Sequence, residues 1–193
     1  MDMFDTSSQV TSVLHIARHL LGKGKAVTSD ERGVAAVEFA LFAGMLSLSM
    51  INAIDVSTYI YKRMELENAT QMGAQAAWKA CDTNHLPATT SCSGLTAAVT
   101  NAVQSTSLGS HVSMPSGSPS EGYYCLNNTN ALQYVSDVTK KPSNCAAAGM
   151  PNLQPADYIK VQTSFAYAPL FPGISITSAF VTPINKTAMM RLD

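Results

Sequence analysis

One carboxylate, Glu38, lies inside an otherwise uncharged run between Arg32 and Asp55, GVAAVEFALFAGMLSLSMINAI. Residues 34–54 would measure about 32 Å as a helix, which matches a hydrocarbon core of about 30 Å. A carboxylate in such a helix is unfavourable by about 2–3 kcal/mol at the bilayer centre and by less near its edge. We therefore predict that residues 34–54 span a membrane and that Glu38 has a function there.

Two roles for Glu38 are open. Its carboxylate can reach the headgroups as an interfacial residue, close to a helix N-terminus whose dipole favours negative charge. Alternatively, if the chain is cut between Gly33 and Val34, Glu38 becomes the fifth residue of the mature protein. The new α-amine of Val34 can then pair with Glu38 of a neighbouring subunit and align identical helices in a fixed axial stagger.

Four cysteines form the second group with potential chemistry, and all of them follow the apolar run: Cys81, Cys92, Cys125 and Cys145. An even number of cysteines in a segment rich in Ser, Thr and Asn favours disulfides in an oxidising compartment; four free thiols are the alternative. The spacings contain no CxxC and do not match a zinc framework. Of the three connectivities, we favour Cys81 with Cys92 and Cys125 with Cys145, because each pair closes a short local loop.

The remaining reactive residues do not form a recognisable site in the sequence. His15 and His19 have the i, i+4 spacing of a metal pair, but an HExxH glutamate and a third ligand are missing, so we expect no metal. The sequence contains no P-loop, no G-x-S-x-G and no G-x-G-x-x-G motif. We predict a protein that is not an enzyme and that needs no cofactor.

Composition and charge exclude further classes of function. The formal net charge is −1 and aromatic residues make up 7% of the chain. Both values argue against a nucleic-acid partner, because such proteins are usually basic or present aromatic stacking surfaces. Charged residues make up only 13% while the apolar fraction is an ordinary 46%. This balance favours a protein that is membrane-embedded, exported, or both.

The charges beside the apolar run predict its orientation. More basic residues precede the run than follow it: Arg18, Lys23, Lys25 and Arg32 before, Lys62 and Arg63 after. Because basic residues concentrate on the cytoplasmic side of a membrane, we expect a cytoplasmic N-terminus. The part that contains the cysteines should then lie outside the cytoplasm.

Periodicity predicts an α+β fold with four parts. These are a cytoplasmic leader (1–33), the transmembrane part of a long helix (34–54), the stalk part of the same helix (55–80), and an extracytoplasmic, disulfide-tied head with antiparallel β-strands (81–193). The helix is expected over 30–80, since small and apolar residues recur at helical steps beyond the span. Ser47, Ser49 and Asn52 make the span moderately polar and suit contacts between helices.

Within the head, local patterns predict one helix and several strands. The helix is expected over 94–108, with Ser93 as its N-cap and Gly109 as its stop. Residues 122–126 and 131–135 flank NNTN as a hairpin, and 114–122 is predicted as a loop. The remaining expectations concern the C-terminal part: a strand over 157–167, an extended segment over 174–181 and a closing strand over 187–193.

The stretch ERGVAAVEFALFAGMLSL, followed by IYKRMELENATQMGAQAAW, resembles the start of the TadE-like proteins. These are minor pilins, or pseudopilins, of the tight-adherence (Flp, type IVb) pilus system. Their pattern is a Gly, a small apolar tetrad, a Glu and an aromatic residue before a membrane helix. Gly33, residues 34–37, Glu38 and Phe39 match that pattern in order. The strand-like segment 157–191, which ends in Met-Met-Arg, extends the resemblance to the other end of the chain.

The resemblance implies a non-catalytic pseudopilin that supports pilus biogenesis and surface adherence. It implies cleavage after Gly33 by a prepilin peptidase and assembly through Glu38 and Phe39. The implied partners are other pilin subunits, the peptidase, the inner-membrane assembly platform and membrane lipid, and the implied location is the inner membrane or the pilus. The alternative is an uncut single-pass membrane protein with an extracytoplasmic binding or assembly domain.

Overall fold

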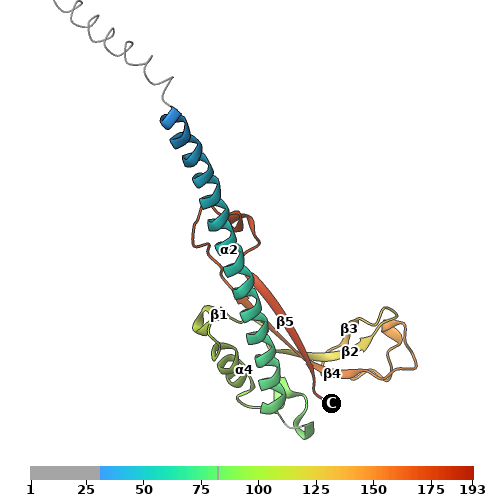
Figure 1. The fold of residues 1–193 in the computed structure, drawn as a ribbon. Coiled ribbons are helices and arrows are strands. Elements are labelled where there is room, and N and C mark those ends of the chain that lie inside the picture. The colour runs from blue at the N-terminus through green and yellow to red at the C-terminus, as the bar shows by residue number, and fades with distance from the viewer. Residues whose placement is uncertain (1–30, 82) are drawn as a thin grey trace, which may run out of the picture. The chain divides into compact units, whose positions relative to one another are not determined.

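The computed structural model of the chain describes residues 31–81 and 83–193. The chain divides into two compact units, Met1–Ile51 and Asn52–Asp193. The predicted leader (1–33) lies almost wholly outside the described residues, as do His15 and His19. A long helix followed by an antiparallel sheet with two disulfides confirms the predicted α+β class (Figure 1).

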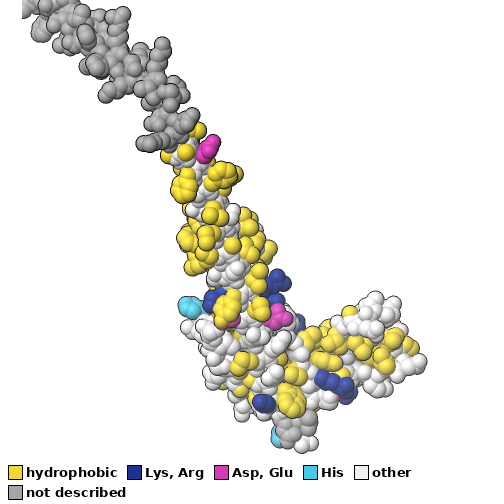
Figure 2. All heavy atoms as spheres, viewed as in Figure 1, with side chains coloured by type: hydrophobic (Ala, Val, Ile, Leu, Met, Phe, Trp, Pro, Cys, Tyr) yellow, Lys and Arg dark blue, Asp and Glu magenta, His cyan; other side chains and the backbone are white. Residues whose placement is uncertain are grey.

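The long helix α2 covers Glu31–Ala80, in agreement with the prediction of 30–80. Its sequence is rich in Ala and contains no Pro, so the backbone hydrogen-bond ladder is not interrupted. In the first unit, the described residues 33–50 are exposed except Ala43, which is half-buried. This helix is long and apolar enough to cross a membrane, and Figure 2 shows hydrophobic side chains covering its first described turns.

The polar side chains in this apolar stretch are satisfied inside the helix. The Ser47 hydroxyl donates to the Ala43 carbonyl at 2.7 Å, and the Ser49 hydroxyl donates to the Met45 carbonyl at 3.0 Å. Such bonds to the preceding turn leave no free hydroxyl to be desolvated. Ser47 and Ser49 therefore need no neighbouring helix to be tolerated in an apolar environment.

The second unit is built on a five-stranded antiparallel sheet. Its longest strand, β4 (Ala156–Phe165), pairs along eight residues with β5 (Ile184–Arg191). Along its other edge, β4 pairs first with β2 (Ser120–Leu126) and then, at its end, with β1 (Val112–Ser113). The hairpin partner of β2 is β3 (Leu132–Ser136), so the predicted hairpin and the predicted strand at 157–167 are confirmed.

The second part of α2 packs against this sheet and against α4 (Leu95–Gln104) to form the main core. The buried face of α2 is made mostly of small residues, including Ala69, Ala74 and Ala77. At Gly73, a Cβ atom would lie 2.6 Å from a methyl of Val103 on α4 and 3.3 Å from a methyl of Val161 on β4. The missing side chain at position 73 is what allows the three elements to approach so closely.

Both disulfides are local. Cys81 is bonded to Cys92 around the short helix α3 (Ala88–Ser91), and Cys125 on β2 is bonded to Cys145. These are the pairs favoured from the short loops they close. The second bond lies in a small buried cluster of its own with Ala148, separate from the main core.

The helix predicted at 94–108 is present, but its N-cap and its C-terminal end differ from the prediction. α4 covers only Leu95–Gln104, and its N-cap is Gly94 in the left-handed conformation (φ 88°) instead of Ser93. After Gln104, the hydroxyls of Ser105 and Thr106 bond to carbonyls of the last helical turn. Hydroxyl side chains compete with the helical backbone for these acceptors, which explains why the helix stops before Gly109.

Two predicted loop and strand segments also need correction. β2 begins at Ser120, which pairs with Lys160, so 114–122 is not a loop over its last three residues. The segment 174–181 is not extended, because it contains the 3-10 helix η4 (Ile176–Ala179). The Ser175 hydroxyl accepts the backbone N–H of Thr177 at 3.2 Å, and this cap outweighs the extended preference of β-branched residues. The closing strand starts earlier than predicted, at Ile184.

Candidate functional site

The residues predicted for processing and assembly lie in the first turns of α2. Gly33, Val34, Glu38 and Phe39 are all exposed, and no heavy atom lies within 4 Å of a Cβ placed on Gly33. Glu38 follows Val34 by four residues, which places the two on one face of the helix. The structure thus presents these four residues together on an uncovered helical surface.

The surroundings of Glu38 are apolar. Large hydrophobic side chains are exposed on both sides of it in the sequence: Val34, Val37, Phe39, Leu41, Phe42 and Met45. A carboxylate among such side chains is stabilised by a cation brought by another molecule or by reaching polar headgroups. The Glu38 carboxylate can form an ion pair in this arrangement. The exposed side chains around it do not include a nucleophile next to a base.

A second polar position on α2, Asp55, was not predicted. Its side chain is fully buried and holds the chain between β4 and β5. The carboxylate accepts the N–H of Leu170 at 3.1 Å, the N–H of Phe171 at 3.3 Å and the hydroxyl of Thr177 at 3.5 Å. The Asp55 carbonyl accepts the hydroxyl of Tyr167 at 3.2 Å. In the sequence, Asp55 was visible only as the charge that ends the apolar run.

Asn52, one turn earlier on α2, binds the same connection. Its side-chain oxygen accepts the N–H of Ile176 at 2.8 Å. Further along α2, the ring of Tyr59 makes edge contacts with Tyr167 and Phe180, with ring centroids 5.1 and 4.8 Å apart. The structure therefore gives Asn52 a role within the head, whereas the sequence suggested a contact between membrane helices.

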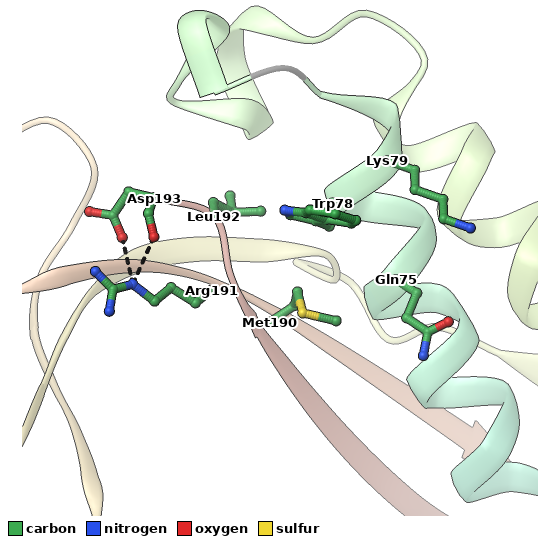
Figure 3. A pocket seen from close by; sticks show the side chains of 7 residues that line it. All are labelled: Gln75, Trp78, Lys79, Met190, Arg191, Leu192 and Asp193. Carbon is green, nitrogen blue, oxygen red and sulfur yellow. Dashed lines mark hydrogen bonds and ion pairs between the residues drawn. The ribbon is translucent and has the colours of Figure 1, made fainter.

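A shallow pocket of about 650 Å³ lies between the end of α2 and β5. Figure 3 shows Trp78 facing Leu192 and Met190, while Arg191 turns toward Asp193. The Arg191 Nε donates to a main-chain oxygen and to the side-chain Oδ1 of Asp193 at 2.7 and 3.2 Å. This lining supplies apolar contacts with a paired charge at the rim, which suits contact with another molecule more than a reaction.

A carboxyl group with a shifted pKa lies on β4. Burial, together with the nearby carboxylates of Glu121 and Asp193, raises the pKa of Asp157 to about 7, and Lys141 acts in the opposite direction. The Oδ1 atom of Asp157 is buried without a hydrogen-bond partner among the described residues. Glu121 itself accepts the N–H groups of Ala88 and Thr89 at 2.8 and 2.7 Å. These contacts join β2 to α3, which is a structural use of the Glu121 carboxylate.

Metal ligands do not gather in the part of the chain that the structure describes. Among those residues, no three His, Cys, Asp or Glu side chains are placed as a metal would need them. The two predicted thiol pairs are joined as disulfides, and disulfide sulfurs are not available as thiolate ligands.

Comparison with known proteins finds a match for most of α2. Residues 33–75 match the family model described as TadE-like protein, whereas no curated protein and no solved structure matches the chain. The matched segment begins at Gly33, includes Glu38 and Asp55, and ends just beyond Gly73. The match confirms the resemblance inferred from residues 33–39 and associates the chain with the TadE-like proteins of tight-adherence pilus systems.

Proposed function

We propose that the protein is a minor pilin or pseudopilin of a tight-adherence (type IVb) pilus assembly. It acts without catalysis, and it supports pilus biogenesis and surface adherence. The observation that best supports this proposal is the division of α2: its first part is apolar and exposed, whereas one face of its second part is buried against the head. A large exposed apolar surface marks a site of lipid or protein contact. A pilin helix contacts lipid before assembly and other subunits after it.

The proposed location is the inner membrane, with the N-terminus in the cytoplasm and the head outside. The excess of basic residues before the span supports this orientation, and so do the two disulfides, which persist in oxidising compartments. The proposed partners in the membrane are lipid, a prepilin peptidase and the assembly platform. After cleavage between Gly33 and Val34, the partners become other pilin subunits.

Assembly would depend on a charge pair. Cleavage frees the α-amine of Val34, and we propose that Glu38 of an adjacent subunit binds it. Inside a packed bundle of apolar helices, an unpaired carboxylate is strongly unfavourable, whereas a carboxylate paired with an amine is tolerated. Because only one stagger between identical helices brings the two groups together, the pair would set the axial position of each subunit. Phe39 would pack beside it.

Two substitutions separate cleavage from assembly. Glu38→Leu should keep membrane insertion, since the span becomes more apolar, but it should lose co-purification with the other pilus components. Gly33→Leu should block cleavage and leave a full-length membrane protein. Ser47→Leu is the matched control, because it adds the same side chain to the span while the only group removed is a hydroxyl satisfied within the helix.

N-terminal sequencing and a co-purification blot give the readouts. The proposal expects a mature N-terminus at Val34 and a Glu38→Leu protein that is cut but not assembled. If Glu38→Leu assembles as well as the parent, the pairing role is wrong and Glu38 is an interfacial residue. If the parent protein functions at full length, the uncut single-pass alternative replaces the pilin proposal.

A further inference from the structure

The connection between β4 and β5 has an inverted distribution of polarity. We call residues 168–181 the pinned loop, because Asp55 and Asn52 bind its backbone. Two of its three hydroxyl residues, Ser175 and Thr177, are buried, and the third, Ser178, is exposed. Its large apolar side chains are exposed instead: Leu170, Phe171, Ile174, Ile176 and Val181. A loop that faces water normally shows the opposite arrangement.

The pinned loop lies at the level where α2 is expected to leave the membrane. Asn52 and Asp55 stand at the end of the uncharged run that begins after Arg32. The next charges along α2 are Lys62 and Arg63, about 10 Å further on as a helix. In Figure 1 the loop lies beside α2, and its bonds to Asn52 and Asp55 fix it to that part of the helix.

Charge also favours a lipid partner for this loop. No Lys, Arg, Asp or Glu occurs in residues 166–185, although the head is otherwise charged on several strands. The carboxylate of Asp55 is buried and accepts hydrogen bonds from the loop. The loop therefore presents no ionic group to the surface above it, and it is fixed to the helix where the apolar run ends.

We propose that the pinned loop inserts its apolar side chains into the interfacial layer of the membrane that α2 spans. Apolar groups in such positions reach about 5–10 Å into the headgroup and acyl boundary. The head would then be held against the bilayer at two points, the helix and the loop, which restricts its tilt and rotation. This inference rests on the membrane anchor of the proposed function, but it does not depend on cleavage or on assembly into a pilus.

Tryptophan quenching in nanodiscs tests the insertion. The full chain contains one Trp, Trp78, which is 51% exposed and lies about 36 Å along α2 from Ile54. The probe is Val181→Trp in a Trp78→Phe background, since Val181 is 80% exposed. The parent protein, with Trp78 alone, is the matched control. Nitroxide-labelled phospholipids, with the label near the glycerol end of the chain, quench from the lipid side; iodide quenches from the water side.

The inference expects the Val181→Trp probe to lose most of its emission to the labelled lipid and little to iodide, with Trp78 showing the reverse. A probe quenched by iodide and not by lipid overturns it. A probe protected from both quenchers also overturns it, because another protein surface then covers the loop. If the labelled lipid quenches Trp78 as strongly as it quenches the Val181→Trp probe, the loop has no specific role in insertion. Failure of the parent protein to enter nanodiscs overturns the membrane anchor itself, and with it this inference.

Discussion

The carboxylate of Asp55 is excluded from solvent in the second unit, where a charge is tolerated only with hydrogen-bond partners. Two backbone N–H groups and one hydroxyl supply them. All three donors belong to the pinned loop, so the loop and the helix stabilise each other. Asp55 thus contributes three of the hydrogen bonds that hold the pinned loop against α2.

Asp55→Ala should destabilise the second unit by about 2–5 kcal/mol, because it removes hydrogen bonds to a charged group and leaves buried donors unpaired. Hydrogen exchange should show early loss of protection at the amides of Leu170 and Phe171. Glu67→Ala is a suitable control, since Glu67 is an exposed acid on the same helix and pairs with Lys186 at 2.7 Å. Unchanged exchange in the Asp55→Ala protein would show that the loop does not depend on this carboxylate.

Asp157 makes stability depend on pH. Its folded-state pKa of about 7 is above the ordinary value of 3.8, so the native state binds a proton more tightly than the unfolded chain does. The stability that this group contributes is complete below about pH 4 and is lost as the pH rises through about 7. Asp157→Asn should remove this dependence, and denaturant unfolding at about pH 5 and about pH 8 measures it.

The expected result is that Asp157→Asn gains stability relative to the parent at the higher pH and loses that advantage at the lower one. Asp137→Asn is the control, because the pKa of Asp137 is lowered by hydrogen bonds from Thr139 and its contribution has the opposite sign. Parallel pH profiles for the parent and Asp157→Asn would contradict the shifted pKa.

At the scale of elements, sequence patterns predicted the helices, strands and disulfides that depend on residues close together in the chain. The long helix, the hairpin and β4 follow from periodicity within a few residues, and the disulfide pairs follow from short loop lengths. The pinned loop could not be predicted, because Asp55 and its partner Leu170 are 115 positions apart and no local signal links them. For the candidate site, the sequence motif predicts the roles of Gly33, Glu38 and Phe39. The partner proposed for Glu38 belongs to another molecule, so no contact within this chain could have indicated it.

Gly73 tests the packing of α2 against α4 and β4. Gly73→Ala should destabilise the head by about 1–3 kcal/mol through overpacking, even though Ala favours an isolated helix by about 1 kcal/mol. The added methyl would meet Val103 at 2.6 Å, and Val103→Ala in the same protein should restore part of the loss. Gly44→Ala is the matched control, since its Cβ meets nothing within 4 Å. Thermal unfolding of the four proteins gives the comparison.

The bond between Cys125 and Cys145 should stabilise one region of the head. Replacing both cysteines by Ser should lower stability by about 3 kcal/mol, a value expected for a loop of this length. Because the bond lies in its own small cluster, lost protection from hydrogen exchange should concentrate in β2, β3 and the segment around Ala148. In the double Cys→Ser protein, uniform loss of protection across the sheet would contradict a local role. For the parent protein, mass measurement without reductant should find no alkylatable thiol.

On the scale of the whole molecule, the boundary between units does not coincide with the end of the helix. The chain divides between Ile51 and Asn52, inside α2, so the predicted stalk (55–80) is packed as part of the second unit. In the first unit, the described residues form an exposed apolar stretch of helix. The second unit uses the same helix as the central element of its core. The same helix α2 therefore belongs to both units.

This division predicts which fragments fold. A fragment of residues 52–193 retains every member of the main core and both residues that bind the pinned loop, so it should unfold cooperatively in mild detergent. A fragment of residues 60–193 lacks Asn52, Asp55 and Tyr59, and with them the contacts of Tyr59 to Tyr167 and Phe180. Its melting temperature should be lower by about 10 °C, because several kcal/mol of hydrogen bonds and ring contacts are lost. Both fragments keep the two disulfides, which removes the redox state as a difference between them. Equal melting temperatures would show that the head ends at residue 60 and that the turns of α2 around Asp55 belong to the membrane segment instead.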